Sequence, residues 1–540
     1  MSALDHPVLA GGPAPQLPAQ ALHSTAANAT AVAEPATQAP HQALDPDLFR
    51  QQAFIDGHWR DGHARTPVFD PASGTPLGTV PSLQATVVRE AVLAAKAAGL
   101  AWRRLLPQDR AELLLAWYGL ILDAKEDLAV LMTLEQGKSL ADARGEIDYG
   151  ASFIRWYAEE GRRTHGETIP SHLPGKRLWT TRAPVGVVAC VTPWNFPNAM
   201  LTRKGAAALA AGCTIVAAPS METPFSALAL AELAQRAGFP AGVFNVVTGD
   251  PETVVGSLCD DPDVAALSFT GSTAIGRRLL ARCAPTVKRM SMELGGHAPF
   301  IAFDDVDLDV LVAAAIDAKF QTSGQDCLAA NRIYVQRSIY PAFVERFTAA
   351  AARLKVGDGF DPDAVINPLI HVRAAAAVHA QVQDACEGGA RLLLGGEPLA
   401  NGANWYPPTV LADVDESMRI CSEETFGPVA ALIPFDDEDA VIAAANDTRY
   451  GLAAYLFTRD IERIERVSVA LDYGMVAINS VKMTGAPVPF GGVGDSGLGR
   501  EGGRQGIDEF QEVRYFCLGA LEPGHRDSAP REPAPAESGK

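Results

Sequence analysis

The sequence predicts an α/β protein built on a parallel sheet with helices on both faces. Three observations support this fold class. First, short apolar runs alternate with helix-length runs from Pro184 onward, which is typical of strands joined by crossover helices. Second, a chain of 540 residues that is 48% hydrophobic has room for several domains and a large buried core. Third, residues 268–276 combine an apolar run, a glycine turn and a helix start, an arrangement that offers N–H groups to a phosphate.

The expected elements follow in chain order. A short strand near Phe54 runs into a turn, and a helix follows whose apolar residues recur at helix-face spacing from Val87 to Ala98. The alternating region is expected to contain strands over residues 185–191, 214–218, 243–247 and 265–269. Its helices are expected over residues 198–211, 227–237 and 273–281. A second α/β stretch then runs from Gly296 to Gly485, followed by a glycine-rich segment and a final strand.

Both ends of the chain differ from the rest in composition. Residues 1–47 are rich in Ala, Pro, Gln and Thr and contain no Lys or Arg, so we expect a disordered extension. The segment lacks the arginines of a mitochondrial presequence and the basic start and apolar block of a secretory signal. Residues 520–540 are charged and rich in Pro, and we expect a second disordered tail there.

Charge and cysteine usage restrict the partners. The chain has 45 Lys and Arg against 64 Asp and Glu, a net charge of −19, which disfavours nucleic acid and anionic membranes as partners. The uncharged run 183–202 approaches membrane-spanning length, but Pro184, Pro193 and Pro197 would break a helix there. None of the eight cysteines has metal-site or redox-motif spacing, so we expect reduced thiols, no metal and a cytoplasmic location.

Five short motifs occur in order between residues 193 and 428. They are 193–197 (PWNFP), 269–273 (FTGST), 293–296 (ELGG), 324–327 (GQDC) and 423–428 (EETFGP). Together they resemble the aldehyde dehydrogenase superfamily, over residues 54–519. Within it, residues 223–230 (TPFSALAL) and 496–502 (SGLGREG) most resemble succinate-semialdehyde dehydrogenases.

The resemblance implies an aldehyde dehydrogenase-like fold of three parts. A Rossmann-type dinucleotide-binding domain is expected over residues 48–167 and 184–295, and an α/β catalytic domain over residues 296–504. Residues 168–183 and 505–519 are expected to pair as a small β arm used in oligomerisation, so that the protein forms a homodimer or homotetramer.

Four residues are predicted to carry the chemistry. Cys327 is expected at a junction between a loop and a helix, where the helix N-terminus would lower the pKa of the thiol and favour the nucleophilic thiolate. The resemblance implies that Asn195 donates to the oxyanion, that Glu293 is the base for thioester hydrolysis, and that Lys204 belongs to the proton network. Taken alone, Asn195 could equally cap the helix after Pro197.

The resemblance also assigns a cofactor site. Its residues are expected to be Thr192, Trp194, Ser220, Gly271, Ser272, Gly276, Leu294, Glu424 and Phe426. The chain departs from the family where a Lys usually binds the adenosine ribose or its 2′-phosphate, because Ala218 replaces that Lys and Met221 replaces a nearby acidic residue. Loss of this cation favours NAD, with NADP as the alternative.

The substrate residues are expected to be Arg203, Gln321 and Thr484. In succinate-semialdehyde enzymes two arginines and a hydroxyl bind the distal carboxylate; this chain keeps the first as Arg203, has Gln321 at the second and Thr484 at the hydroxyl position. One arginine can still bind a carboxylate in bidentate fashion.

These residues predict NAD(P)-dependent oxidation of a short acidic or polar aldehyde, with succinate semialdehyde favoured, through a cysteine thiohemiacetal and thioester. Three alternatives stay open. The chain could be a cofactor-independent thiol esterase or hydrolase, it could oxidise an aldehyde without a carboxylate, or it could be a non-catalytic protein that keeps the fold.

Overall fold

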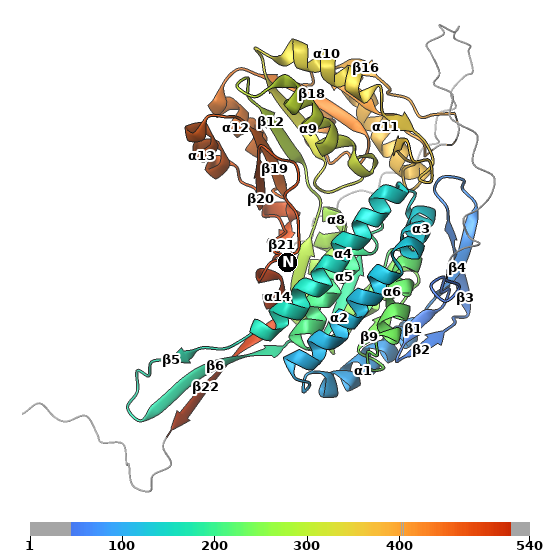
Figure 1. Cartoon of the computed structure of the whole chain (residues 1–540), viewed down its shortest axis with the longest axis vertical. Coiled ribbons are helices and arrows are strands. Elements are labelled where there is room, and N and C mark those ends of the chain that lie inside the picture. Colours follow the sequence, from blue (N-terminus) through green and yellow to red (C-terminus); the bar gives the residue numbers. More distant parts are fainter. Residues whose placement is uncertain (1–44, 401, 403, 520–540) are drawn as a thin grey trace, which may run out of the picture. The chain divides into compact units, whose positions relative to one another are not determined.

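The computed structural model describes residues 45–400, 402 and 404–519 (Figure 1). The predicted tail 520–540 and most of the predicted extension 1–47 lie outside these residues. Asp45 and Asp47, at the edge of the predicted extension, are described and contact Arg236 on one of the helices. No helix of the described part combines the length and apolar character that crossing a membrane requires.

The first sheet has eight strands in the order β2-β1-β9-β8-β7-β10-β11-β21. Strands β9, β8, β7, β10 and β11 are parallel to one another, and β1, β2 and β21 add antiparallel edges. The bounds are β1 (Ala53–Ile55), β2 (His58–Arg60), β7 (Val187–Thr192), β8 (Thr214–Pro219), β9 (Phe244–Val246), β10 (Val264–Thr270), β11 (Arg289–Glu293) and β21 (Gly497–Leu498). The chain order reverses between β7 and β10, and ligands of parallel sheets bind at such a switch point, beyond the carboxyl ends of the strands.

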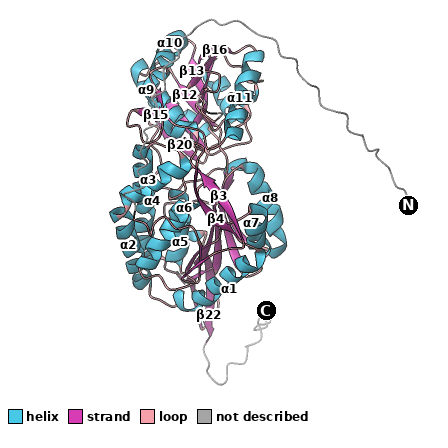
Figure 2. Cartoon of the chain, turned by 90° about the vertical axis from the view of Figure 1, so that its right-hand side faces the viewer, coloured by secondary structure: helices cyan, strands magenta, loops and turns pink. Residues whose placement is uncertain are grey.

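The second sheet has seven strands in the order β16-β17-β18-β13-β12-β19-β20, all parallel except β16. The bounds are β12 (Ala298–Ala302), β13 (Ala330–Gln336), β16 (Arg391–Leu394), β17 (Thr409–Ala412), β18 (Val429–Phe435), β19 (Ala453–Phe457) and β20 (Met475–Ile478). Two parallel sheets with helices on both faces confirm the predicted α/β class (Figure 2).

Helices cover both faces of each sheet because the central strands are apolar on both sides. In β7, Val188 and Cys190 pack into one core while Val187, Ala189 and Val191 pack into the other, as the two-residue repeat of a strand requires. The first sheet is accompanied by α1 (Ala85–Trp102), α2 (Pro107–Asp123), α3 (Lys125–Gln136), α4 (Leu140–Glu160), α5 (Ala199–Ala211), α6 (Pro224–Arg236), α7 (Pro251–Asp260) and α8 (Thr273–Cys283). The second is accompanied by α9 (Leu308–Phe320), α10 (Tyr340–Ala351), α11 (Val372–Glu387), α12 (Glu438–Asn446) and α13 (Ile461–Ala470).

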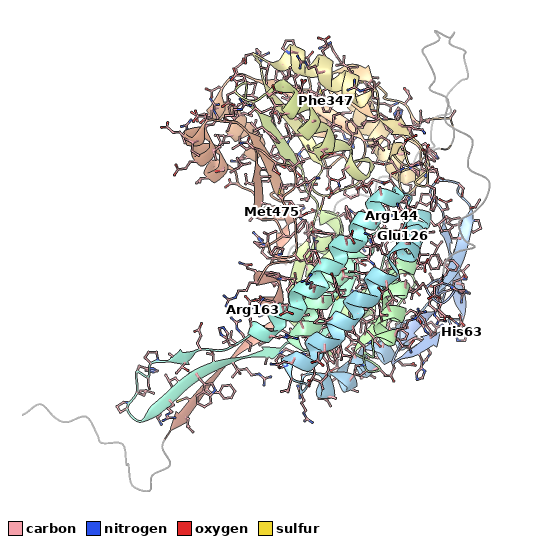
Figure 3. The ribbon with its side chains drawn as sticks, in the orientation of Figure 1. His63, Glu126, Arg144, Arg163, Phe347 and Met475 are labelled. Carbon is pink, nitrogen blue, oxygen red and sulfur yellow. The ribbon has the colours of Figure 1, made fainter. Side chains whose placement is uncertain are left out.

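Helix α4 presents a charged outer face and a functional inner face. Arg144 on α4 donates two hydrogen bonds, of 2.8 and 3.0 Å, to the same Oε2 of Glu126 on α3, and Figure 3 places both side chains on the outer side of the helices. Glu146 is buried, and Tyr149, three residues further along, lies on the same side of the helix. These two residues reach the candidate site described below.

A three-stranded arm extends from the first sheet's helices (Figure 1). It consists of β5 (Thr168–Ile169), β6 (Lys176–Pro184) and β22 (Gln511–Gly519), and β22 is antiparallel to β6. The expected strand over residues 505–519 is shorter than predicted, because α14 (Gln505–Asp508) occupies its beginning. Two further pairs, β3 (Ala64–Phe69) with β4 (Pro76–Ser82) and β14 (Lys355–Val356) with β15 (Ala364–Ile366), lie outside the two main sheets.

The expected catalytic segment 296–504 does not lie wholly with the second sheet. Its end returns to the first sheet, where Gly497 and Leu498 of β21 pair with Glu293 and Met292 of β11. Without β21, the N–H and C=O groups along this edge of β11 would have no strand partner, so the pairing is favourable. The return also places Glu501 beneath the candidate site.

Candidate active site

Two cavities meet at Cys327. One, of about 250 Å³, lies at the switch point of the first sheet and is lined by residues that follow β7, β10 and β11. The other, of about 340 Å³, lies between α4, α5, α9 and the segment after β20. Cys327 and Met200 line both cavities. A group bound in one cavity and a group bound in the other would therefore both reach the Cys327 thiol.

The predicted helix after Cys327 is wrong. The residues after the thiol form a short turn and then strand β13, because this segment pairs between β12 and β18. In the described segment after Cys327 no helix begins whose N-terminus could lower the pKa of the thiol. Burial, together with the carboxylates of Glu293 and Asp326, raises the pKa of Cys327 well above its ordinary value. The thiol therefore needs a base to become a nucleophile.

The backbone before Cys327 is strained. Thr322 and Ser323 have φ angles of +51° and +57°, in the left-handed region that residues with a branched Cβ rarely adopt. Such strain persists only where the surroundings enforce it, and it gathers at functional sites. Here Ser323 donates to the Asn367 carbonyl at 3.1 Å and accepts from the Asn367 N–H at 2.8 Å. These two hydrogen bonds hold the strained turn against Asn367.

Asn195 lies in the smaller cavity beside the thiol. Its Nδ2 donates to the Gln325 carbonyl at 3.1 Å, two residues before Cys327. The alternative that Asn195 caps the following helix is wrong, since Asn198 occupies the capping position of α5. The amide is therefore available to a ligand at Cys327.

A buried ion pair missed by the sequence analysis holds the Asn195 loop. Nζ of Lys138 contacts Glu146 at 2.6 Å and donates to the Asn195 carbonyl at 2.7 Å. The other carboxylate oxygen of Glu146 accepts from the N–H groups of Asn198 at 2.9 Å and Ala199 at 3.0 Å. No sequence pattern joins Lys138 to Asn195, because their contact depends on how α4 packs against α5.

Glu293 is the last residue of β11, as predicted, and it is buried in the smaller cavity. Burial raises the pKa of its carboxyl to about 7, against the opposing effect of Arg203. Its Oε1 contacts no hydrogen-bonding group of the described residues. A carboxyl with this pKa can exchange a proton near neutral pH.

Arg203 and Lys204 are both buried and both pair with Glu501. Glu501 is 297 residues from Lys204 and was not predicted as a site residue. The guanidinium of Arg203 also stacks on the Phe490 ring at 4.2 Å. Although burial opposes it, the two cations lower the pKa of Glu501. Arg203 is therefore not the free cation that the sequence suggested, because part of its charge is already compensated.

The smaller cavity has apolar walls and a buried carboxylate. Trp194 and Phe426 form its apolar walls, with ring centroids 5.5 Å apart at 85°. Glu424 accepts from the Gly296 N–H at 3.0 Å, and burial raises the pKa of its carboxyl to about 8. A Cβ at Gly295 would lie 2.7 Å from Oε2 of Glu424, so a larger residue there would displace this carboxylate.

The remaining predicted cofactor residues surround this cavity or lie near it. Gly271, Ser272 and Leu294 line it, and Ser272 precedes α8 without using its hydroxyl as a cap. Gly276 packs directly against Leu294. Thr192 ends β7 and Ser220 follows β8; neither lines the two cavities, and the Ser220 hydroxyl bonds the carboxylate of Glu222.

The larger cavity gathers the predicted substrate residues. Arg203, Gln321 and Thr484 line it together with Cys327. Four acidic residues and a second cation also line it, and they are Asp142, Glu146, Asp317, Asp326 and Lys482. Across the described residues, no group of three or more His, Cys, Asp or Glu side chains is placed to hold a metal.

The fold and the site are those of a two-sheet α/β protein with a cysteine where the sheets meet. The sequence profile of the aldehyde dehydrogenase family matches residues 59–516. An aspartate-semialdehyde dehydrogenase (non-phosphorylating) of Halomonas elongata is 57% identical over 483 residues, 89% of this chain and 98% of that protein. An NADP(+) succinate-semialdehyde dehydrogenase of Escherichia coli is 52% identical over 477 residues, 88% of this chain and 99% of that protein.

The fold of this chain also matches solved structures of aldehyde dehydrogenases. A crystal structure of succinate-semialdehyde dehydrogenase from Burkholderia pseudomallei superposes with a TM-score of 0.88 at 48% identity, covering 88% of this chain and 100% of that one. The chain belongs to the aldehyde dehydrogenase family. The predicted family resemblance, including that to succinate-semialdehyde dehydrogenases, is confirmed.

Proposed function

We propose that the protein oxidises a short aldehyde carrying a distal carboxylate to the corresponding acid, with NAD as the oxidant. The main observation in support of this proposal is the position of Cys327. Its thiol lines the cavity that contains Asn195, Glu293 and Glu424, and also the cavity that contains Arg203 and Thr484. An aldehyde held by its far end in the larger cavity would present its carbonyl carbon at the sulfur.

The first step is the attack of sulfur on the aldehyde. Glu293, whose pKa is about 7, accepts the thiol proton. The new C–S bond moves the carbonyl electron pair onto oxygen. Asn195 Nδ2 and the N–H of Cys327 then donate to that oxygen, replacing the bond that Asn195 now makes to the Gln325 carbonyl.

Bound NAD would supply the hydride acceptor for the resulting thiohemiacetal, so that Cys327 would then carry a thioester. Glu293 first releases the thiol proton to solvent and then removes a proton from water, which attacks the thioester carbonyl. The C–S bond breaks, and the sulfur leaves as thiolate, which takes up a proton to restore the thiol. One aldehyde, one NAD⁺ and one water thus yield one carboxylate, one NADH and two protons.

The residues around the smaller cavity fit the nicotinamide end of such a cofactor. Trp194 and Phe426 would flank the ring, and Glu424 would accept from ribose hydroxyls. Thr270 contributes a buried hydroxyl without a protein partner in the described residues, at the end of β10. Gly271, Ser272 and Gly276, at the start of α8, suit a pyrophosphate.

Residues at the end of β8 and just after it support NAD over NADP. Ala218 offers no cation to a 2′-phosphate, and the segment that follows contributes the carboxylate of Glu222 beside Ser220. A carboxylate there would repel a phosphate and accept from a ribose hydroxyl.

Arg203 and Thr484 support a carboxylate at the far end of the substrate. The relatives described above are named for aspartate and succinate semialdehydes, both four-carbon aldehydes that end in a carboxylate. We propose this class for the present chain, with succinate semialdehyde as its unsubstituted member.

A comparison of substrates tests this function. The purified protein with NAD should produce NADH from succinate semialdehyde with a kcat/KM at least about tenfold above that for butanal, which lacks the carboxylate. Cys327→Ser should abolish NADH production, whereas Cys517→Ser, at the exposed cysteine of the arm, should not. Hydrolysis of nitrophenyl acetate without NADH production from any aldehyde would instead establish the esterase alternative.

We also propose that β22 mediates a homo-oligomer. Val513, Tyr515 and Leu518 on this strand are each more than half exposed, an unusual concentration of apolar surface for one strand. A second copy of the chain could cover them.

A further inference from the structure

We propose that the larger cavity contains an ammonium subsite at Asp326 beside the carboxylate subsite at Arg203. The enzyme would then prefer a semialdehyde that carries an amino group next to its carboxylate. This inference rests on the proposed function and specifies its substrate. The class of substrate is a 2-amino-4-oxo acid, of which aspartate semialdehyde is the four-carbon member.

Asp326 faces the substrate cavity from the position directly before the nucleophile. It lines the cavity with Cys327, Arg203 and Thr484. Its Oδ1 accepts from the Leu328 N–H at 3.0 Å, and the carboxyl also lies beside the Cys327 thiol; burial raises the pKa of Asp326. None of the ion pairs among the described residues includes Asp326. The carboxylate is thus available to a ligand.

The groups around the cavity carry no net positive charge before a substrate binds. Lys138 pairs with Glu146, and Arg203 and Lys204 share Glu501. With the carboxylate of Asp326 the formal charges of these groups sum to zero, and Asp142, Asp317 and Lys482, which also line the cavity, add one net negative charge. A substrate with a single negative charge would leave an uncompensated charge in a buried site, which is costly. A substrate with one ammonium and one carboxylate leaves the net charge unchanged.

The rest of the cavity is compatible with an ammonium group. Gln321 carries no charge, where a second arginine would repel an amino group. Asp142 and Asp317 line the cavity as well, and neither takes part in an ion pair of the described residues. The negative electrostatic potential of these two carboxylates favours cationic groups in the cavity, and the positive charge of Lys482 opposes this effect.

A purely structural role for Asp326 is the competing explanation. Its bond to the Leu328 N–H, two residues on, forms a common turn that an asparagine makes equally well. Asp326→Asn therefore keeps the turn and removes the charge. The substitution separates the two explanations without changing the size of the side chain.

The experiment measures kcat/KM for aspartate semialdehyde and succinate semialdehyde, with NAD, in three proteins. In the unaltered protein aspartate semialdehyde should have the higher value. D326N should lower kcat/KM for aspartate semialdehyde at least about tenfold and leave or raise that for succinate semialdehyde. Q321R should shift the preference in the same direction, by adding to the same cavity a cation that repels the amino group. Binding of L-aspartate and succinate, measured by calorimetry, should change in parallel.

Three results would overturn the inference. They are a preference of the unaltered protein for succinate semialdehyde, equal losses for both substrates in D326N, and no change in either. If D326N does not fold, an unchanged preference in Q321R overturns it. In each of these cases oxidation of succinate semialdehyde would still support the proposed function. Absence of NADH from either semialdehyde, with another aldehyde oxidised, would instead contradict the proposed function itself.

Discussion

The carbonyl oxygen of Asn195 accepts a 2.7 Å hydrogen bond from the buried ammonium of Lys138. The same ammonium pairs with Glu146, which in turn accepts from the first N–H groups of α5. One buried ion pair thus holds the loop of Asn195 and the start of the next helix. The position of the proposed oxyanion donor depends on a contact between α4 and α5, and not on the loop alone.

Lys138→Met should therefore impair both stability and catalysis. Removing one partner of a buried pair costs about 3–5 kcal/mol of the free energy of unfolding, because the other charge stays buried. Displacement of Asn195 should lower kcat by about 10²-fold, the usual effect of losing an oxyanion donor. Denaturant unfolding and steady-state kinetics measure the two effects, and KM for NAD should stay nearly constant.

Lys125→Met is the matched control for this change. Lys125 pairs with Asp148 at 2.6 Å on the surface, where an ion pair contributes only about 0–1 kcal/mol. Full activity of Lys138→Met would show that the Asn195 loop holds its position without the pair.

Glu293 should impose a pH dependence on turnover. With a pKa of about 7, its carboxyl is largely protonated below neutral pH and cannot accept a proton. If thioester hydrolysis limits the rate, kcat should rise up to about tenfold per pH unit toward pH 7 and level off above it. Glu293→Gln should remove this rise and lower kcat by about 10²-fold. A rise centred near pH 4–5 would contradict the assignment.

Ala218→Lys should change the choice of cofactor. The new cation would lie at the end of β8, where it can pair with a 2′-phosphate. We expect the KM for NADP to fall at least about tenfold, and the KM for NAD to change little. Titration of NADPH by fluorescence measures the same effect without turnover. Ser220→Ala, which removes only a hydroxyl two residues further on, is the control.

Charged substitutions on β22 should dissociate the proposed oligomer. Val513→Asp combined with Tyr515→Asp places two charges on one face of the strand, since alternate residues point the same way. Light scattering after gel filtration should show a smaller particle at the same melting temperature of the subunit. Ile461→Asp on α13, three-quarters exposed and remote from the arm, serves as the control. An unchanged mass would exclude β22 from the interface.

Sequence patterns predicted the structure best where an element depends only on residues close together in the chain. Strands β7, β8, β9 and β10 and helices α5 and α8 lie within a few residues of their predicted bounds, because apolar runs and glycine turns act over short distances. The five motifs also predicted which residues converge, since Cys327, Asn195, Glu293 and Glu424 line one cavity. The helix expected after Cys327 failed for a physical reason. An apolar run of that length fits either a helix or a buried strand, and pairing with β12 and β18 decides for the strand.

The sequence by itself therefore determined the fold class, the family and the candidate nucleophile, because each depends on residue types at short spacing. Only the tertiary structure showed which charged groups of the site lie close enough to compensate one another. Glu501 reaches Lys204 across 297 residues, and Lys138 reaches Asn195 across 57. Electrostatic energies depend on distance in space and on burial, and neither can be obtained from the order of the residues alone. The same dependence makes Arg203 a compensated cation and leaves Asp326 available to a substrate.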